Sequence, residues 1–476
     1  MHKAMRNAVI FNKKINISCI TVIAAVLLCA FCACIGGRGT GQESTTAPVL
    51  LTPSAEPTAE MTIKPSAAAT NDPEEDIVAE MMTEMTLEEK VGQLFIVRPE
   101  SLDESFTPNQ AHGSARYSDT DCSAGMADFL AAHPAGGIAF FGKNIENPEQ
   151  TVAFIQNLQK ASRIPLFIAV DEEGGTVARI ANSPAFTVPK YDGAQAVGST
   201  GDPEKVRAMY SAIGGYLAEL GFNLDFAPVA DVNSNPNNTV IGNRAFGSDP
   251  KLVAKMVNAA ISGLHKENII ACIKHFPGHG DTAGDTHDGY VALEKDWQQL
   301  SECELIPFYN AINETDMIMA AHITLTRGNT DNLPCSLSYD ALTMHLRGEM
   351  GYNGVIITDA LAMGAIAENY SSKESAVLAF NAGADILLMP YDYAAAFNGI
   401  LSAVQTGEIS LDRLNESVER ILRLKILKRE ARKKLLGSCR FSRRNKADNP
   451  RDMPDDRLRR TESHKQGIKR CIAIAL

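Results

Sequence analysis

Residues 274–287 hold three histidines and two aspartates within fourteen positions. They follow an apolar run, Ile269–Ile273, that is typical of a buried strand, and the glycines and proline among them indicate a loop. Imidazole and carboxylate groups gathered on one loop favour proton-transfer chemistry over packing. The same groups could supply nitrogen and oxygen ligands to zinc or manganese, but their spacing matches no closed zinc pattern.

The chain around this loop, from about residue 76 to 429, alternates short apolar runs with longer amphipathic ones. The apolar runs predict eight strands, Leu94–Val97, Ile138–Phe141, Leu166–Val170, Leu224–Val229, Ile269–Lys274, Met317–His322, Val355–Thr358 and Asp385–Met389. Most are nearly continuous in apolar residues, as expected of strands buried on both faces. Together with the helices they predict an α/β fold, a (β/α)8 TIM-like barrel, with an open doubly wound sheet as the alternative.

Capping residues mark where helices begin between these strands. Thr86 with Glu89 predicts a capping box, and Asn-Pro or Asp-Pro pairs predict helices that begin at Pro148, Pro203 and Pro250. Two helices also show an apolar face at helical spacing. The faces consist of Val253, Met256, Val257, Ala260 and Leu264 in one helix, and of Leu411, Leu414, Val418, Ile421 and Leu422 in the last, which starts at Ser410.

Acids, bases and cations stand where four of the predicted strands end. They are Asp171 with Arg179, Lys274 with His275, His322, and Asp359. Catalytic groups of (β/α)8 barrels lie at the C-terminal ends of strands and in the loops that follow, so we predict an active site at the barrel mouth. A carboxylate at Asp359 could attack an electrophilic carbon there, or it could cap the next helix.

The chain resembles glycoside hydrolases of family 3, in particular their β-N-acetylglucosaminidase branch. The resemblance spans roughly residues 80–428, and its most specific motif is 274–287. The other motifs are Asp171–Gly175 with Arg179, Asn223–Val229, Ile241–Gly247 and Thr358–Leu361.

The resemblance assigns roles to individual residues. It implies that Asp359 is the nucleophile and that His287, paired with Asp285, is the general acid/base. Residues that would hold the sugar in the first subsite are Asp171, Arg179, Arg244, Lys274 and His275. Retaining hydrolysis needs one carboxylate that forms a glycosyl-enzyme and a second group that transfers the proton. Imidazole, with a pKa of about 6.5, suits the second task, and a carboxylate two residues away could orient it. No cofactor is implied.

The expected activity is removal of terminal, non-reducing β-N-acetylglucosamine, with retention, from short saccharides such as cell-wall fragments. Transfer of the sugar to phosphate and β-glucosidase activity are close alternatives. A metal-dependent hydrolase would leave Asp359 without a role, and an inactive sugar-binding lipoprotein would be expected to have lost Asp359, Asp285 or His287. The chain departs from the family at Glu172 and Thr176, where glutamine and arginine are common, and at Thr286, where serine is frequent. We expect these changes to affect binding beyond the first sugar.

The ends of the chain differ in composition from the predicted barrel domain, residues 76–429. Residues 1–34 combine basic residues with an apolar run that ends near Cys34, which predicts a lipoprotein leader and an extracytoplasmic, membrane-anchored protein. A plain signal anchor is the alternative. Residues 35–75 are rich in Ser, Thr and Pro and predict a flexible tether, and the basic segment 430–476 predicts a disordered tail. The formal net charge of −12 argues against a nucleic-acid partner.

Overall fold

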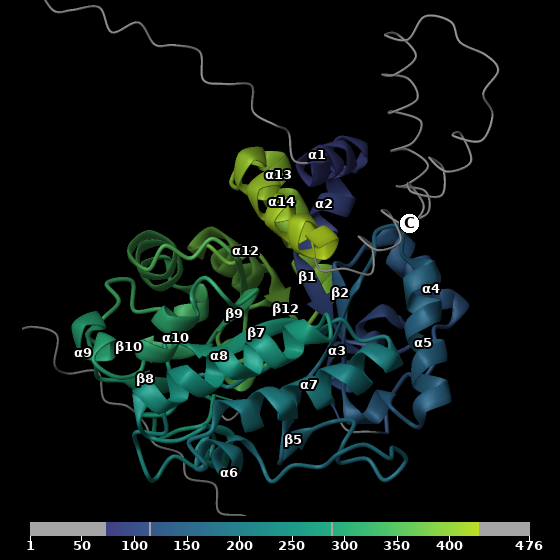
Figure 1. Ribbon diagram of the computed structural model, residues 1–476. Coiled ribbons are helices and arrows are strands. Elements are labelled where there is room, and N and C mark those ends of the chain that lie inside the picture. The colour runs from purple at the N-terminus through teal and green to yellow at the C-terminus, as the bar shows by residue number, and fades with distance from the viewer. Residues whose placement is uncertain (1–72, 114–115, 287–288, 428–476) are drawn as a thin grey trace, which may run out of the picture. The chain divides into compact units, whose positions relative to one another are not determined.

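The computed structural model describes residues 73–113, 116–286 and 289–427 (Figure 1). The predicted leader, the predicted tail, nearly all of the predicted tether and the proposed acid/base His287 therefore lie outside the described residues. The tether prediction extended to residue 75, whereas a helix, α1 (Pro73–Glu84), already begins at Pro73. Within the described part of the chain, no helix is both long and apolar enough to cross a membrane.

Eight parallel strands form the centre of the molecule and confirm the predicted barrel. They are β1 (Phe95–Val97), β2 (Gly137–Phe140), β3 (Phe167–Val170), β6 (Leu224–Asp225), β7 (Ile270–Phe276), β9 (Met317–Ala320), β11 (Val355–Thr358) and β12 (Leu387–Leu388). Each strand pairs with its neighbour in chain order, and β1 also pairs with β12. A parallel bridge between Ile357 and Ile386 joins β11 to the residue before β12, which closes the ring.

Helices follow the strands and cover the outside of this ring, with α7 and α8 side by side in Figure 1. The longer ones are α4 (Ala124–Ala132), α5 (Pro148–Ala161), α7 (Pro203–Leu220), α8 (Pro250–Lys266), α12 (Ser372–Ala382), α13 (Tyr393–Thr406), α14 (Leu411–Leu427) and the π-helix η5 (Asp340–Glu349). The shorter ones are α2 (Leu87–Gln93), α3 (Pro108–His112), α6 (Ala194–Gly198), α9 (Trp297–Ser301), α10 (Ile306–Ala311), α11 (Gly364–Ala367), η1 (Pro99–Leu102), η2 (Gly142–Asn144), η3 (Gly242–Arg244) and η4 (Cys335–Leu337).

Local capping accounts for where several of these helices begin. The Thr86 and Glu89 side chains form the predicted capping box of α2. Asn147, Asp202 and Asp249 each cap a helix whose first residue is proline. The predicted inner face of α8 is fully buried. In α14 the prediction was wrong for Leu411, which is 57% exposed. Leu411 is the first residue of that helix and lies before the turns that contact the core.

Two predicted strands end earlier than expected because the chain leaves the ring at the mouth, and β12 (Leu387–Leu388) is shorter than the predicted strand Asp385–Met389. β6 ends at Asp225, although Val229 still makes an isolated bridge to Lys274. β9 ends at Ala320, and the residues after His322 form a separate strand, β10 (Ile323–Leu325), that pairs with β8 (Val291–Leu293). A hairpin of β4 (Glu172–Gly174) and β5 (Val177–Ala178) follows β3. These additions surround the mouth and position the candidate site.

Candidate active site

Of the titratable residues predicted at the strand ends, all except His322 line one cavity of about 350 Å³. Those of the predicted site that line it are Asp171, Arg179, Arg244, Lys274, His275 and Asp359. They come from β7, η3 and the segments after β3, β5 and β11. Since only the C-terminal ends of parallel strands can bring these segments together, the location agrees with the rule for (β/α)8 barrels.

Lys274 is the centre of a buried ion-pair network at the base of this cavity. Its Nζ lies 2.8 Å from Asp171 Oδ1 and 2.7 Å from Glu173 Oε1. Burial alone would lower the pKa of Lys274, but the two carboxylates outweigh burial and raise it. Asp171 also faces Arg179, with Nη2 3.6 Å from Oδ2. Burial favours the neutral form of Asp171, yet Lys274 and Arg179 lower its pKa, so it remains ionised.

Glu173 is a site residue that the sequence analysis did not single out. Arg244 donates two hydrogen bonds to it, from Nε at 2.9 Å and from Nη2 at 2.8 Å. Burial raises the pKa of Glu173, but Lys274 and Arg244 bring it down to about 2. The sequence contains one signal that could have identified Glu173. It stands two residues after Asp171, and this spacing places side chains of an extended segment on one face. Fixed in this way, Arg244 and Lys274 present their remaining donors to the cavity.

His275 is held by a carboxylate from the segment after β6. Its Nδ1 lies 2.7 Å from Asp231 Oδ2, and Asp231 Oδ1 accepts hydrogen bonds from the backbone N–H groups of His275 and His279. Asp231 therefore has an architectural role, since it fixes the His275 ring and the backbone around it. This arrangement leaves His275 Nε2 as the ring nitrogen available to a ligand. His279 is buried, and its Nδ1 lies 2.8 Å from Thr282 Oγ1.

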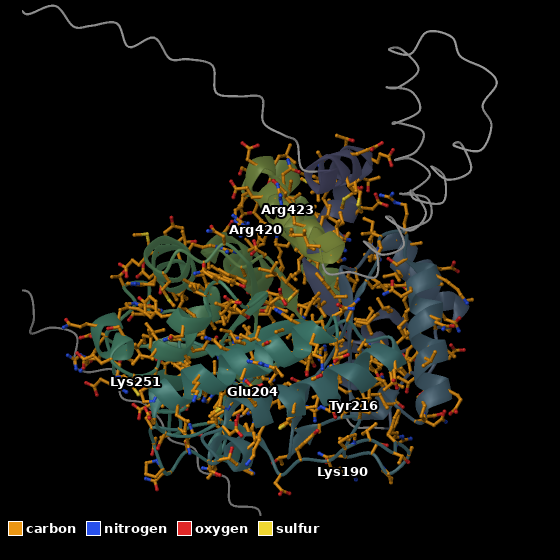
Figure 2. All side chains as sticks on the ribbon, in the orientation of Figure 1. Lys190, Glu204, Tyr216, Lys251, Arg420 and Arg423 are labelled. Carbon is orange, nitrogen blue, oxygen red and sulfur yellow. The ribbon has the colours of Figure 1, made fainter. Side chains whose placement is uncertain are left out.

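Glu172, one of the departures from the family pattern, lies beneath the cavity and outside its lining. Its carboxylate accepts hydrogen bonds from the backbone of Ile180 and Ala181 and from the hydroxyl of Tyr216. Tyr216 extends from α7 and is labelled in Figure 2. Three donors suit a carboxylate better than an amide, whose NH2 group would face another donor. Glu172 therefore supports the loop that carries Arg179.

Asp359 follows β11 and lines the cavity. Its backbone N–H donates to Ala320 O at 2.8 Å, and its Oδ1 accepts from Ala360 N at 2.7 Å. His322 supports the same segment, because its Nε2 lies 2.9 Å from Ala360 O while its Nδ1 lies 2.7 Å from Ser336 Oγ. The contact with Ala360 N is local, and no helix begins at that residue. Asp359 is therefore not a helix cap, which was the alternative prediction.

The loop after β7 is packed tightly in its first half. A Cβ on Gly280 would lie 1.8 Å from Val232 O, and one on Gly278 would lie 2.7 Å from Glu304 Cβ. Close packing thus requires glycine at these two positions. Further along, Thr286 lines the cavity and its carbonyl accepts from Ala365 N at 3.2 Å. This bond brings the Asp285–Thr286 segment beside the segment that follows Asp359.

His287 itself cannot be placed, because it lies outside the described residues, and Asp285 is half-buried. Within the described residues, no three His, Cys, Asp or Glu side chains are grouped so that they could hold a metal ion.

Comparison with known proteins identifies the family. The profile of the glycosyl hydrolase family 3 N-terminal domain matches residues 86–424. Beta-hexosaminidase A of Pseudoalteromonas piscicida is 34% identical over 350 residues, covering 66% of this chain and 58% of that protein. Beta-hexosaminidase LpqI of Mycobacterium tuberculosis is 33% identical over 271 residues, covering 55% of this chain and 68% of that protein.

A solved structure agrees with these sequence relatives. The family 3 β-N-acetylglucosaminidase from Paenibacillus sp. str. FPU-7 is 36% identical, with a TM-score of 0.66. The match covers 72% of this chain and 63% of that one. The chain thus spans somewhat under two thirds of the Pseudoalteromonas relative and of the Paenibacillus structure.

Proposed function

The chain belongs to glycosyl hydrolase family 3, and on that premise we propose that it is a retaining β-N-acetylhexosaminidase. Its substrate is a short saccharide with a terminal, non-reducing β-N-acetylglucosamine, such as a cell-wall fragment. The observation that supports this proposal most strongly is the cavity itself, in which Asp359 faces the same space as Asp171, Arg179, Arg244, Lys274 and His275.

The fixed polar groups suit the binding of a sugar. Lys274 and Arg244 are held by Glu173, and His275 is held by Asp231, so their remaining donors keep one orientation. Asp171 adds an ionised acceptor beside Lys274. Sugar hydroxyls both donate and accept, and preorganised partners of both kinds can position the ring without reorganising during the reaction.

The proposed reaction has two steps. Asp359 attacks the anomeric carbon and forms a glycosyl-enzyme, while His287 gives its proton to the departing oxygen. In the second step His287 takes a proton from water, the water oxygen attacks the anomeric carbon, and Asp359 leaves as a carboxylate. Asp285 stabilises the charged imidazole of His287. The hydrogen bond from Ala365 N to Thr286 O holds the Asp285–Thr286 segment beside the segment that follows Asp359. This proximity supports the assignment of the nucleophile and the acid/base to one reaction.

A panel of p-nitrophenyl β-N-acetylglucosaminide, β-glucoside and β-xyloside tests the sugar specificity. We expect the first to be hydrolysed with a kcat/KM at least ~10-fold above the others, and equal rates would contradict the proposal. The same assay with inorganic phosphate present separates hydrolysis from phosphorolysis, because only the latter produces a sugar 1-phosphate. Formation of that product as the main one would assign the chain to the phosphorylase alternative.

A further inference from the structure

An ion-pair network outside the cavity joins the two ends of a segment in the loop that follows β7. The Nζ of Lys295 lies 2.8 Å from Asp281 Oδ2 and 2.7 Å from Glu304 Oε1. Asp281 comes before Asp285 in this loop, and Lys295 comes after β8, so the bridge spans the segment that contains Asp285. Burial lowers the pKa of Lys295, but hydrogen bonds to the two carboxylates outweigh burial and raise it. Lys295 is therefore a cation at neutral pH.

Glu304 attaches this network to the body of the barrel. It lies between α9 and α10, its side chain is fully buried, and its Oε1 also accepts a hydrogen bond from Ser234 Oγ at 3.2 Å. A buried carboxylate needs a compensating cation, and Lys295 supplies it. Asp281 is not required for this purpose, because it adds a second carboxylate to a cation that is already paired. Its side chain is 26% exposed and belongs to the loop.

The two ends that the bridge connects are held by different parts of the barrel. At the first end, Asn238 Nδ2 donates to His279 O at 2.8 Å and to Thr282 O at 3.1 Å, which ties the backbone to the segment after β6. At the second end, β8 pairs with β10, which follows β9, and α9 begins shortly afterwards (Figure 1). The ion pair between Asp281 and Lys295 therefore sets the distance between two separately anchored ends.

The segment between these ends lies beside the candidate site. Its two arms are in contact, because a Cβ on Gly284 would lie 3.2 Å from Val291 Cγ2. Thr286 lines the cavity, and its carbonyl accepts from Ala365 N. A change in the spacing of the ends would therefore displace Asp285 and the residues next to it. Displacing a reacting group by about 1 Å can lower a rate by about 10²-fold.

We propose that Asp281 and Lys295 are positioning residues that hold the segment between them, and Asp285 with it, beside the segment that follows Asp359. This proposal rests on the proposed function, in which the held segment carries the group that protonates the departing oxygen. Neither residue is among those that line the cavity, so both act through the loop and not on the substrate. The loss on breaking their ion pair then depends on how much the leaving group needs a proton.

Two substrates that differ in this need test the assignment. Phenoxide requires protonation as it leaves phenyl β-N-acetylglucosaminide, whereas 2,4-dinitrophenolate leaves its glycoside without a proton. Asp281→Asn keeps the size of the side chain and the pair between Lys295 and Glu304. We expect this variant to lower kcat/KM for the phenyl substrate by roughly 10-fold, and for the dinitrophenyl substrate by less than ~2-fold.

Substitutions of Lys295 extend the test. Lys295→Arg keeps a cation that can pair with both carboxylates, and it should remain within ~3-fold of the wild type on the two substrates. Lys295→Met should show the same selective loss as Asp281→Asn, together with a lower free energy of unfolding, because the buried Glu304 loses its cation. The asparagine variant therefore isolates the effect on the loop if the methionine variant folds poorly. Asp412→Asn makes the same chemical change on the exposed surface of α14 and should match the wild type.

The single tryptophan of the chain reports on the local fold. Trp297 begins α9 two residues after Lys295, and it stacks on Phe276 and on His345, with ring centroids 6.0 and 4.0 Å apart. Its fluorescence emission should be unchanged in Asp281→Asn, because the packing of α9 does not involve that carboxylate. A shifted emission with equal losses on both substrates would mean that the network only holds α9 in place, and would overturn the positioning role.

Two kinetic results decide between failure of this proposal and failure of the proposed function. Equal losses of Asp281→Asn on the two substrates, or no loss on either, would overturn the positioning role, provided that His287→Ala loses far more on the phenyl substrate. If His287→Ala itself shows no preference for one substrate, the proposed function is contradicted, because its acid would then not protonate the leaving group.

Discussion

Two lysines withdrawn from water at opposite ends of the barrel have opposite electrostatic surroundings. At the mouth, Lys274 lies between the carboxylates of Asp171 and Glu173, and its pKa is raised. At the other end, the Nζ of Lys425 in α14 lies 2.7 Å from Gln93 Oε1 and 2.8 Å from Gly136 O. The same Nζ lies 4.7 Å from the ring centroid of Phe167, the first residue of β3. Burial lowers the pKa of Lys425 to about 7.

The contrast shows that the partners, more than burial, decide whether a buried lysine is charged. Carboxylates keep Lys274 as a cation that can orient a substrate, whereas amide oxygens accept from Lys425 without compensating its charge. The charged groups around Lys274 face the cavity, whereas Lys425 joins α14 to the strands through polar contacts. The same helix also reaches the strands through ion pairs of Arg413 and Arg420 with Asp385, just before β12. Four substitutions test this division of roles.

Loss of the proposed nucleophile or of the proposed acid/base should have the largest effect, and on activity alone. Asp359→Ala and His287→Ala should each lower kcat by a factor of at least ~10², because each removes a group that forms or breaks a bond in the reaction. The melting temperature should change by only a few degrees. Steady-state kinetics and thermal unfolding measure the two quantities, and a near-normal rate in either variant would refute the role assigned to that residue.

Removal of Lys274 should reduce both activity and stability. Lys274→Met leaves Asp171 and Glu173 close together without their shared cation, and breaking a buried ion pair costs about 3–5 kcal/mol. Denaturant unfolding measures this loss, and Lys251→Met on the exposed surface of α8 is the control (Figure 2). An unchanged free energy of unfolding would show that the network is not needed for the fold.

The same variant should be more sensitive to acid. Glu173 has a folded pKa of about 2 against an ordinary value of 4.5, so its stabilising contribution is present above pH 4.5 and is lost as the pH falls towards 2. Without Lys274 the folded pKa of Glu173 rises, and acid unfolding should begin at higher pH.

Lys425→Met should have the smallest effect on activity, and its effect on the free energy of unfolding should depend on pH. The folded pKa of about 7 lies below the ordinary 10.5, so the unfolded chain binds one more proton between these values. This lysine therefore makes the wild type more stable as the pH rises from 7 to 10.5, by at most about 1.4 kcal/mol per pH unit. The variant lacks this gain, so its stability relative to the wild type should fall over that range. A constant difference from pH 6 to pH 10 would mean that Lys425 stays charged in the folded protein.

The sequence by itself determined the barrel and the elements that compose it. Continuous apolar runs, Asn-Pro and Asp-Pro caps and the spacing of apolar residues in α8 are local signals, and the structure confirms the eight strands they predict. The charged residues at the strand ends could also be located, because parallel strands in a closed ring all point to one mouth.

Only the tertiary structure decided which of these groups pair with one another. Lys274 and Asp171 are 103 positions apart, and no periodicity specifies that Glu173 completes the network between Lys274 and Arg244. The lowered pKa of Lys425 was equally invisible, since it depends on burial by segments far away in the chain, such as the one that contains Gln93, 332 positions away. Local patterns follow from backbone geometry within a few residues, whereas ion pairing and pKa values depend on distances that exist only after the ring has closed.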